Sequence, residues 1–234
     1  MASISALAHP PFVGDDGVWC QQIRPVSGGP RPALFLDRDG VIVEEVNYLH
    51  RVEDMRLTTN AAVVIRAANI HGLPVIVVTN QSGVGRCNYG WSDFEVVQTA
   101  MLDALATENA FIDAVFACPF HGGGQAPWNI ADHPDRKPGP GMLLRAAGMF
   151  PLDMATSWIV GDRAGDMGAG KNAGLAGGLL VRSGHGNDAG ERAEALALSD
   201  TGFQVIIGDE VGAAMRAFPI FPETLRSLTF ADGP

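Results

Sequence analysis

The chain has few cysteines and no apolar run long enough to cross a membrane. Cys20, Cys87 and Cys118 are too few and too scattered to form a disulfide framework. No window reaches the length of a membrane-spanning helix. Residues 1–11 lack the basic start and the long apolar core of a secretory signal. We therefore expect a cytoplasmic protein in a reducing environment.

Basic residues are also scarce. Lys and Arg number 16 against 26 Asp and Glu, which gives a net charge of −10. A surface of this sign is not attracted to the phosphate backbone of nucleic acids or to anionic lipid headgroups. We therefore expect no nucleic-acid and no membrane partner, although a local basic pocket for one small phosphate remains compatible with this charge.

The chain does have the length and composition of a folded domain. Its 234 residues are 47% apolar and 18% charged, which suffices for one sizeable α/β domain with its own core. We find no internal repeat and no low-complexity segment. Nothing in the composition distinguishes a monomer from a small homo-oligomer.

Short apolar runs alternate with segments of helical periodicity. Strands are predicted at 33–36, 74–79, 112–117, 157–160, 178–181 and 203–207. Helices are predicted at 61–70, from a capping box at 92–95 to about 109, from near Pro140, and at 168–173, 189–198 and 210–218. This alternation predicts an α/β fold, a Rossmann-like three-layer α/β/α sandwich with a mainly parallel sheet.

The two ends of the chain are expected to differ from this central region. Residues 1–30 are rich in Pro, Gly and Asp and are predicted to form an extended arm without strong secondary structure. Residues 31–218 are predicted to form the domain, with a flap at 41–57 and a glycine-rich loop at 118–135 beside the site. Residues 219–234 are predicted to be a loosely held tail.

The segment 33–40 carries the first sign of chemistry. A short apolar run ends in Asp37, Arg38, Asp39 and Gly40. Such a run is typical of a buried parallel strand, and sites of open α/β sheets lie at the carboxyl ends of their strands. Two carboxylates this close repel each other unless a cation or a shared proton lies between them. Taken alone, the segment is equally compatible with a strand that stops at a polar turn.

Other strands also end in polar residues that can meet at the same edge. Thr79 ends the second predicted strand, Asp162 and Asp166 follow a later one, and Lys137 precedes a predicted helix. Several carboxylates suit a hard cation such as Mg2+. A lysine and a threonine hydroxyl suit a phosphoryl group, because one supplies charge and the other a hydrogen bond.

Four motifs in this order resemble those of the haloacid dehalogenase (HAD) superfamily of phosphatases. They are 37–40 (Asp-Arg-Asp-Gly), 79–83 (Thr-Asn-Gln-Ser-Gly), 136–138 (Arg-Lys-Pro), and 161–162 (Gly-Asp) with Asp166. The resemblance covers about 32–183 and is to the branch of the histidinol-phosphate and heptose bisphosphate phosphatases, with more likeness to the latter. It implies a HAD-like fold with no large cap domain.

The resemblance implies a role for each matching residue in phosphoryl transfer. Asp37 is expected to be the nucleophile that forms an aspartyl phosphate, and Asp39 the acid and base. Thr79 is expected to hold the phosphate, and Lys137 to stabilise the charge on both nucleophile and phosphate.

The resemblance also implies ligands for a metal and for the substrate. Mg2+ is expected to bind Asp37, the backbone carbonyl of Asp39, and Asp162, with Asp166 behind them. The expected substrate-binding residues are Asn80, Gln81, Ser82, Arg86 and Arg136.

One departure from the resemblance lies in the loop before Lys137. The nearest relatives often carry a zinc loop there, with a Cys-x-His pair and then a Cys-x-Cys pair. This chain has Phe120 at the expected histidine position, and its candidate ligands are Cys118, His121, His133 and Asp135. These are permitted zinc ligands, but structural zinc sites favour thiolates and only one remains. A loop held by ordinary contacts is therefore favoured over a zinc site.

The expected activity is Mg2+-dependent hydrolysis of a small phosphorylated metabolite in carbohydrate metabolism. A sugar phosphate such as D-glycero-D-manno-heptose 1,7-bisphosphate is the expected substrate, and histidinol phosphate is an alternative. A different alternative is a weakly active relative that binds a phosphorylated ligand. An NTPase is disfavoured, because the P-loop-like segment 165–172 has Asn172 where Mg2+ would need Ser or Thr.

Overall fold

A seven-stranded sheet forms the centre of the molecule. The computed structural model describes residues 11–226. The strand order is β1-β4-β3-β2-β5-β6-β7, and each pairing is parallel except that of β1 with β4. The strands are β1 (Trp19–Gln22), β2 (Leu34–Leu36), β3 (Val75–Asn80), β4 (Ala114–Cys118), β5 (Trp158–Gly161), β6 (Gly177–Val181) and β7 (Gln204–Gly208). The expected mainly parallel α/β fold is confirmed.

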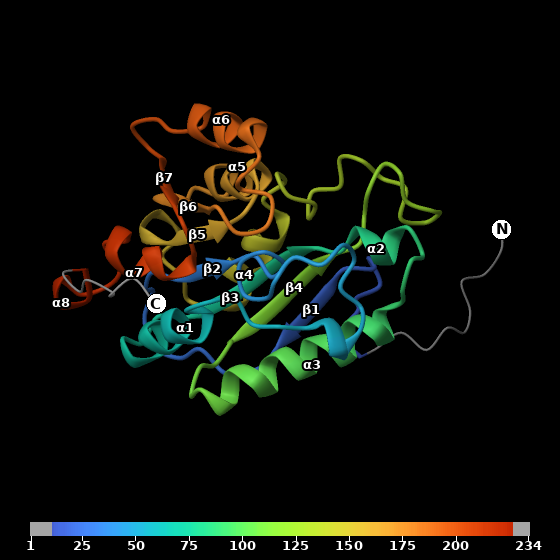
Figure 1. Cartoon of the computed structure of the whole chain (residues 1–234), viewed down its shortest axis with the longest axis horizontal. Helices are drawn as coiled ribbons and strands as arrows, with labels where there is room; N and C mark the ends of the chain where they lie inside the picture. The colour runs from blue at the N-terminus through green and yellow to red at the C-terminus, as the bar shows by residue number, and fades with distance from the viewer. Residues whose placement is uncertain (1–10, 227–234) are drawn as a thin grey trace.

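Helices cover both faces of this sheet (Figure 1). They are α1 (Ala61–Ile70), α2 (Ser82–Gly85), α3 (Trp91–Thr107), α4 (Gly141–Met149), α5 (Ala164–Asn172), α6 (Ala189–Ala197), α7 (Ala214–Ala217) and α8 (Glu223–Arg226). Three short 3-10 turns accompany them: η1 (Val52–Asp54), η2 (Met154–Thr156) and η3 (Val211–Ala213). None of the helices described in residues 11–226 is long and apolar enough to cross a membrane.

Alternate side chains of the central strands enter two separate cores. Leu34 and Leu36 of β2 pack with α1 and α3, whereas Phe35 between them packs with α4 and α5. This division follows from the strand period of two, which sends successive side chains to opposite faces. The three layers place the carboxyl ends of β2, β3 and β5 side by side at the middle of the sheet.

The N-terminal segment contributes an edge strand, so the expectation of an arm without secondary structure is wrong for part of it. β1 runs antiparallel to β4, with Trp19 opposite Ala117. Trp19 is fully buried, and its ring lies 5.6 Å from Trp91 and 5.0 Å from Phe94. The sequence signal is weak because the strand has four residues, two of them glutamine, and it forms by pairing with β4.

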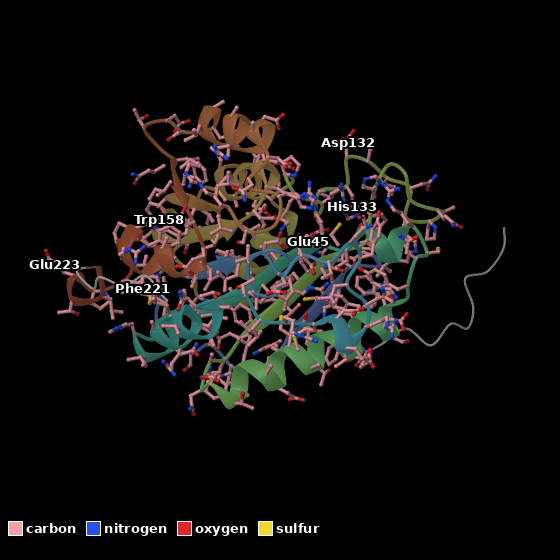
Figure 2. All side chains as sticks on the ribbon, viewed as in Figure 1. Glu45, Asp132, His133, Trp158, Phe221 and Glu223 are labelled. Carbon is pink, nitrogen blue, oxygen red and sulfur yellow. The ribbon has the colours of Figure 1, made fainter. Side chains whose placement is uncertain are left out.

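The C-terminal segment is also more ordered than expected. Phe221 is buried, and α8 follows it, so the expectation of a loose tail from 219 is wrong for its first part (Figure 2). Residues 227–234 of the predicted tail lie outside the described residues. The single helix expected at 210–218 is instead η3 followed by α7.

Two helix starts differ from the sequence pattern because a different carboxylate caps them. At α3 the Gly90 N–H donates to Asp93 at 2.8 Å, in place of the expected box at 92–95. At α5 the Arg163 N–H donates to Asp166 at 2.9 Å, so the helix begins at Ala164 and not near 168. The short helix α2 was not predicted.

Candidate active site

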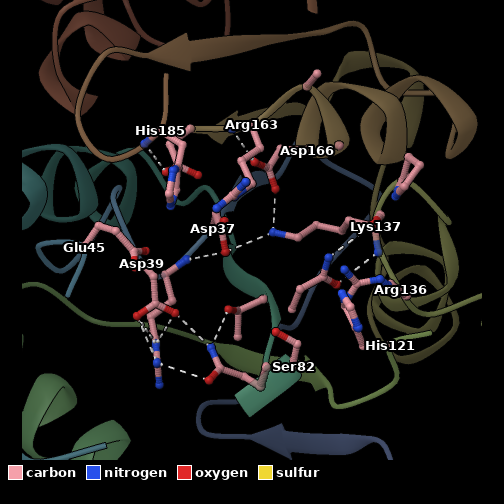
Figure 3. A pocket seen from close by; sticks show the side chains of 18 of the residues that line it. Asp37, Asp39, Glu45, Ser82, His121, Arg136, Lys137, Arg163, Asp166 and His185 are labelled. Atoms are coloured by element: carbon pink, nitrogen blue, oxygen red, sulfur yellow. Dashed lines mark hydrogen bonds and ion pairs between the residues drawn. The ribbon is translucent and has the colours of Figure 1, made fainter. Parts of the chain in front are cut away.

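A cavity of about 810 Å3 lies at the carboxyl ends of β2, β3 and β5. It brings together the four sequence motifs, which are up to 129 residues apart in the chain between Asp37 and Asp166. The residues predicted for catalysis, Mg2+ binding and substrate binding all line it: Asp37, Asp39, Thr79, Asn80, Gln81, Ser82, Arg86, Arg136, Lys137, Asp162 and Asp166. Figure 3 shows Asp37 near the centre of this cavity, with Lys137 pointing toward it.

Lys137 holds two carboxylates together at the base of the cavity. Its Nζ lies 2.9 Å from Asp37 Oδ1 and 2.5 Å from Asp166 Oδ1, and it donates a hydrogen bond to the Val78 carbonyl. Burial by itself would lower the pKa of this ammonium, but the ion pairs with Asp166 and Asp37 raise the pKa above its usual value. Lys137 therefore remains a fixed positive charge.

Three carboxylates gather beside this lysine. Oxygen atoms of Asp37, Asp162 and Asp166, here called the carboxylate cluster, lie within 4.8 Å of one another. Burial raises the pKa of Asp37 to about 7, and the neighbouring Asp166 and Asp39 add to the shift against the opposing effect of Lys137. Burial likewise raises the pKa of Asp162 to about 8, with further increases from Asp37 and Asp166.

The carboxylate cluster has the ligands and the charge deficit of a divalent cation site. One lysine charge faces three carboxylates, so the buried group lacks positive charge. Hard cations such as Mg2+ bind carboxylate oxygens. Gly40 makes room here, because its φ is +78° and a Cβ at this position would lie 2.6 Å from Asp162 Oδ2. The residues present therefore fit Mg2+.

Asp39 is held on the other side of Asp37 by Arg38 and Gln81, of which only Gln81 was predicted as a site residue. Arg38 donates from Nη2 to Asp39 Oδ1 at 2.9 Å and from Nε to Oδ2 at 3.1 Å. Gln81 Nε2 donates to Asp39 Oδ2 at 2.9 Å and is 2.8 Å from Thr79 Oγ1. Tyr89 donates its hydroxyl to Gln81 Oε1. Arg38 is 1% exposed, and its only sequence signal was its place between two aspartates.

Arg86 and Arg136, here called the arginine pair, line the opposite side of the cavity. Arg86 Nη2 lies 3.1 Å from His121 Nδ1, and Arg136 Nη1 donates to the Phe120 carbonyl at 3.0 Å. Among the ion pairs found within residues 11–226, none joins either arginine to a carboxylate. This side of the cavity therefore carries positive charge that an anion can neutralise.

Two predicted substrate-binding residues have clear protein partners. The Asn80 side chain donates to the Lys137 carbonyl at 3.1 Å and accepts from the Lys137 N–H at 3.0 Å, so it fixes the Lys137 backbone to β3. Gln81 bridges Asp39 and Thr79 as described above. Ser82 begins α2 and lines the cavity (Figure 3).

Glu45 and His185 also line the cavity and were missed as site residues. An oxygen of Glu45 and a ring nitrogen of His185 lie within 4.8 Å of each other and of an Asp162 oxygen. His185 donates its backbone N–H to Asp162 Oδ2 at 2.8 Å. Figure 3 shows Glu45 beside Asp39, on the side of Asp37 away from Arg136. The irregular flap gave no spacing from which Glu45 could be identified.

The four candidate zinc ligands do not form a cluster. Within residues 11–226, the two groups of residues able to hold a metal are the carboxylate cluster and the set of Glu45, Asp162 and His185. Neither includes Cys118, His121, His133 or Asp135.

The lysine of the P-loop-like segment has protein partners of its own. Lys171 Nζ, at the end of α5, lies 2.6 Å from Asp200 and donates to the Leu198 carbonyl.

Known proteins are similar to this chain in sequence and in fold. Residues 135–200 match the HAD-hydrolase-like family model. A D-glycero-beta-D-manno-heptose-1,7-bisphosphate 7-phosphatase from Mesorhizobium japonicum is 45% identical over 182 residues, which cover 77% of this chain and 83% of that protein. The enzyme of that name from Escherichia coli K12 is 36% identical over 153 residues, covering 65% of this chain and 80% of that protein.

Two solved structures share the fold over most of their length. A HAD-like phosphatase from Mesorhizobium loti superposes with a TM-score of 0.72 at 41% identity, covering 82% of this chain and all of that one. A D,D-heptose 1,7-bisphosphate phosphatase from B. bronchiseptica, complexed with magnesium and phosphate, superposes with a TM-score of 0.63 at 27% identity. The superposition covers 77% of this chain and 93% of that one. The chain therefore belongs to the haloacid dehalogenase superfamily of phosphatases, in the branch that includes the heptose bisphosphate phosphatases.

Proposed function

We propose that this phosphatase removes one phosphate from a sugar bisphosphate, D-glycero-D-manno-heptose 1,7-bisphosphate, by way of an aspartyl phosphate and with Mg2+ as cofactor. The observation that carries the proposal is the division of charge in the cavity. The carboxylate cluster and Lys137 lie at its base, and the arginine pair lies on one side. The names of the relatives from Mesorhizobium japonicum and Escherichia coli support the substrate.

In the first step the Asp37 carboxylate attacks phosphorus, and the bond between phosphorus and the sugar oxygen breaks. Lys137, 2.9 Å from Asp37, neutralises charge on the nucleophile and on the phosphoryl oxygens. The Thr79 hydroxyl lines the cavity and can donate to a phosphoryl oxygen. Asp39 in its protonated form gives its proton to the departing sugar oxygen, which leaves as the alcohol.

In the second step Asp39, now a carboxylate, takes a proton from water, and the water oxygen attacks phosphorus. The bond between phosphorus and Asp37 breaks, which restores the carboxylate and releases inorganic phosphate. Asp37, the Asp39 carbonyl and Asp162 would hold Mg2+, with Asp166 behind them. When bound, Mg2+ supplies positive charge that neutralises the phosphoryl group. The protein's main contribution is to position groups and charge for phosphoryl transfer.

The arginine pair favours a bisphosphate over histidinol phosphate. Once the scissile phosphate occupies the base of the cavity, a second phosphate can pair with Arg86 and Arg136, which have no carboxylate partner among the described residues. Arginine forms charged, paired hydrogen bonds with phosphate oxygens. Histidinol phosphate has no second phosphate to fill this role.

A phosphate-release assay tests the proposal. The wild type and Asp37→Asn are assayed on heptose 1,7-bisphosphate, heptose 7-phosphate, histidinol phosphate and a panel of sugar phosphates, with and without Mg2+. We expect turnover that needs Mg2+, prefers the bisphosphate, and is lost in Asp37→Asn. Turnover spread evenly over the panel would contradict the substrate, and a folded wild type without any turnover would favour a protein that only binds a phosphorylated ligand.

A further inference from the structure

Candidate zinc ligands of the loop at 118–135 contact other side chains. Three of the candidate zinc ligands are engaged in other ways. The His133 ring stacks on the Phe120 ring with centroids 3.7 Å apart and an angle of 5° between planes. Asp135 pairs through both carboxylate oxygens with Arg145, at 2.7 and 2.8 Å. The Cys118 side chain is fully buried in the apolar core that also contains Phe116 and Phe120.

Arg145 links the loop to the N-terminal segment. It projects from α4, and its Nη2 lies 2.6 Å from Asp16 Oδ2 in the N-terminal segment while also binding Asp135. The Asp135 side chain is 3% exposed, so its charge is compensated inside the protein. A buried carboxylate with a bidentate arginine has no need of a metal to balance it.

Aromatic contacts complete this attachment. Phe120 lies between the stacked His133 and the ring of Trp128, whose centroid is 5.3 Å away at an angle of 68°. Trp128 in turn lies against Gly17, where an added Cβ would be 2.2 Å from the indole. The loop is thus fixed to the turn that precedes β1 as well as to α4. Figure 2 shows His133 at the base of this loop.

We infer that this set of side chains, here called the loop clamp (Asp16, Phe120, Trp128, His133, Asp135 and Arg145), holds the loop in place without zinc and positions the arginine pair. Arg136 directly follows Asp135 and donates to the carbonyl of Phe120. His121 directly follows Phe120 and contacts Arg86. Each arginine therefore contacts a residue that is in the clamp or next to it in sequence. The part of this inference that concerns substrate binding rests on the proposed function. The part that concerns a loop without zinc is independent of it.

Zinc analysis tests the first part without any activity assay. The wild-type protein, produced in medium supplemented with zinc and desalted, is measured by mass spectrometry of metals. We expect well below one zinc per chain, and no change in thermal unfolding or in amide hydrogen exchange of 118–135 when a zinc-selective chelator is added. One zinc per chain, or loss of protection in 118–135 on chelation, would overturn the inference.

Arg145→Met and Asp16→Asn test the positioning role, with Arg24→Met as the matched control. Arg24 also pairs a partly exposed guanidinium with a buried carboxylate, Asp113, but at the opposite end of β4. We expect faster amide exchange of 118–135 in both clamp variants and not in the control. Asp16→Asn keeps the test available if Arg145→Met does not fold.

The kinetic readout separates positioning from a general loss of structure. In the folded variants we expect KM for the sugar bisphosphate to rise about tenfold in Arg145→Met and less in Asp16→Asn, with kcat little changed. Turnover of p-nitrophenyl phosphate, which has no second phosphate, is expected to match the wild type. Arg145→Lys is expected to recover part of the affinity. An equal loss on both substrates would overturn the positioning role, whereas failure of wild type to prefer the bisphosphate would contradict only the proposed substrate.

Discussion

The carboxylate cluster and the loop clamp both contain residues of metal-binding type, but their charges are balanced differently. At the cluster, one lysine pairs with two of three buried carboxylates, and the pKa values of Asp37 and Asp162 rise with burial. In the clamp, Asp135 pairs through both carboxylate oxygens with Arg145, which also binds the partly exposed Asp16. Burial of ionised groups is unfavourable unless they are paired. The comparison teaches that unpaired buried charge, and not ligand type alone, indicates where a cation binds.

The largest expected difference between the two regions is in turnover. Asp37→Asn removes the nucleophile, so we expect kcat to fall by at least about 10^4-fold. Asp135→Asn removes a carboxylate of similar burial that does not touch the substrate, and kcat is expected to stay within about tenfold of wild type. Steady-state phosphate release on folded variants measures both. Similar losses of kcat in the two variants would contradict the division of roles.

Metal removal should affect only one of the regions. Treatment with EDTA is expected to lower activity by about 100-fold or more, because the negative charge of the cluster and the phosphate is then left without its cation. Added Mg2+ should restore the activity, and a zinc-selective chelator should leave it unchanged. Activity that survives EDTA would contradict a required cation at the cluster, and loss of activity with the zinc-selective chelator would contradict a metal-free loop.

The two regions should also respond with opposite sign when a carboxylate is neutralised in metal-free protein. At pH 8.5, Asp162→Asn relieves repulsion with Asp37 and Asp166, so we expect the free energy of unfolding to rise by about 1 kcal/mol. Asp135→Asn leaves Arg145 with a weaker partner, and a loss of about 1–3 kcal/mol is expected. Urea unfolding in EDTA measures both; changes of the same sign would count against the charge argument.

The smallest expected effect is a dependence of Mg2+ stabilisation on pH. Asp37 and Asp162 have folded pKa values of about 7 and 8, above the usual value of 3.8, so metal-free protein loses stability as pH rises from about 4 to about 8. Mg2+ binds the ionised carboxylates, and the increase in Tm that it causes should therefore grow from pH 6 to pH 8.5. Arg145→Met should show the same trend. A shift that is constant over this range would mean that the carboxylates do not ionise there.

The fold could be predicted where local pattern and burial agree. The strand β3 is an uninterrupted β-branched run, and such runs have no other favourable place than a covered parallel sheet. β1 could not be predicted, because Gln21 and Gln22 carry no apolar alternation and its pairing partner β4 lies almost a hundred residues away. The early start of α5 was missed for another reason. Asp166 was interpreted only as a site residue, but its carboxylate also caps the helix by accepting the Arg163 N–H.

The sequence by itself determined the six strands β2–β7 and the polar residues at their carboxyl ends. It thereby determined the place of Asp37, Asp39, Lys137 and Asp162, since the parallel connections leave one edge of the sheet at which they can meet. The tertiary structure alone decided which charges are paired. Asp135 could be a zinc ligand or an arginine's partner, and only the approach of Arg145 and Asp16, 129 residues apart, distinguishes the two. Electrostatic compensation is a matter of distances between side chains, and residue order does not specify those distances.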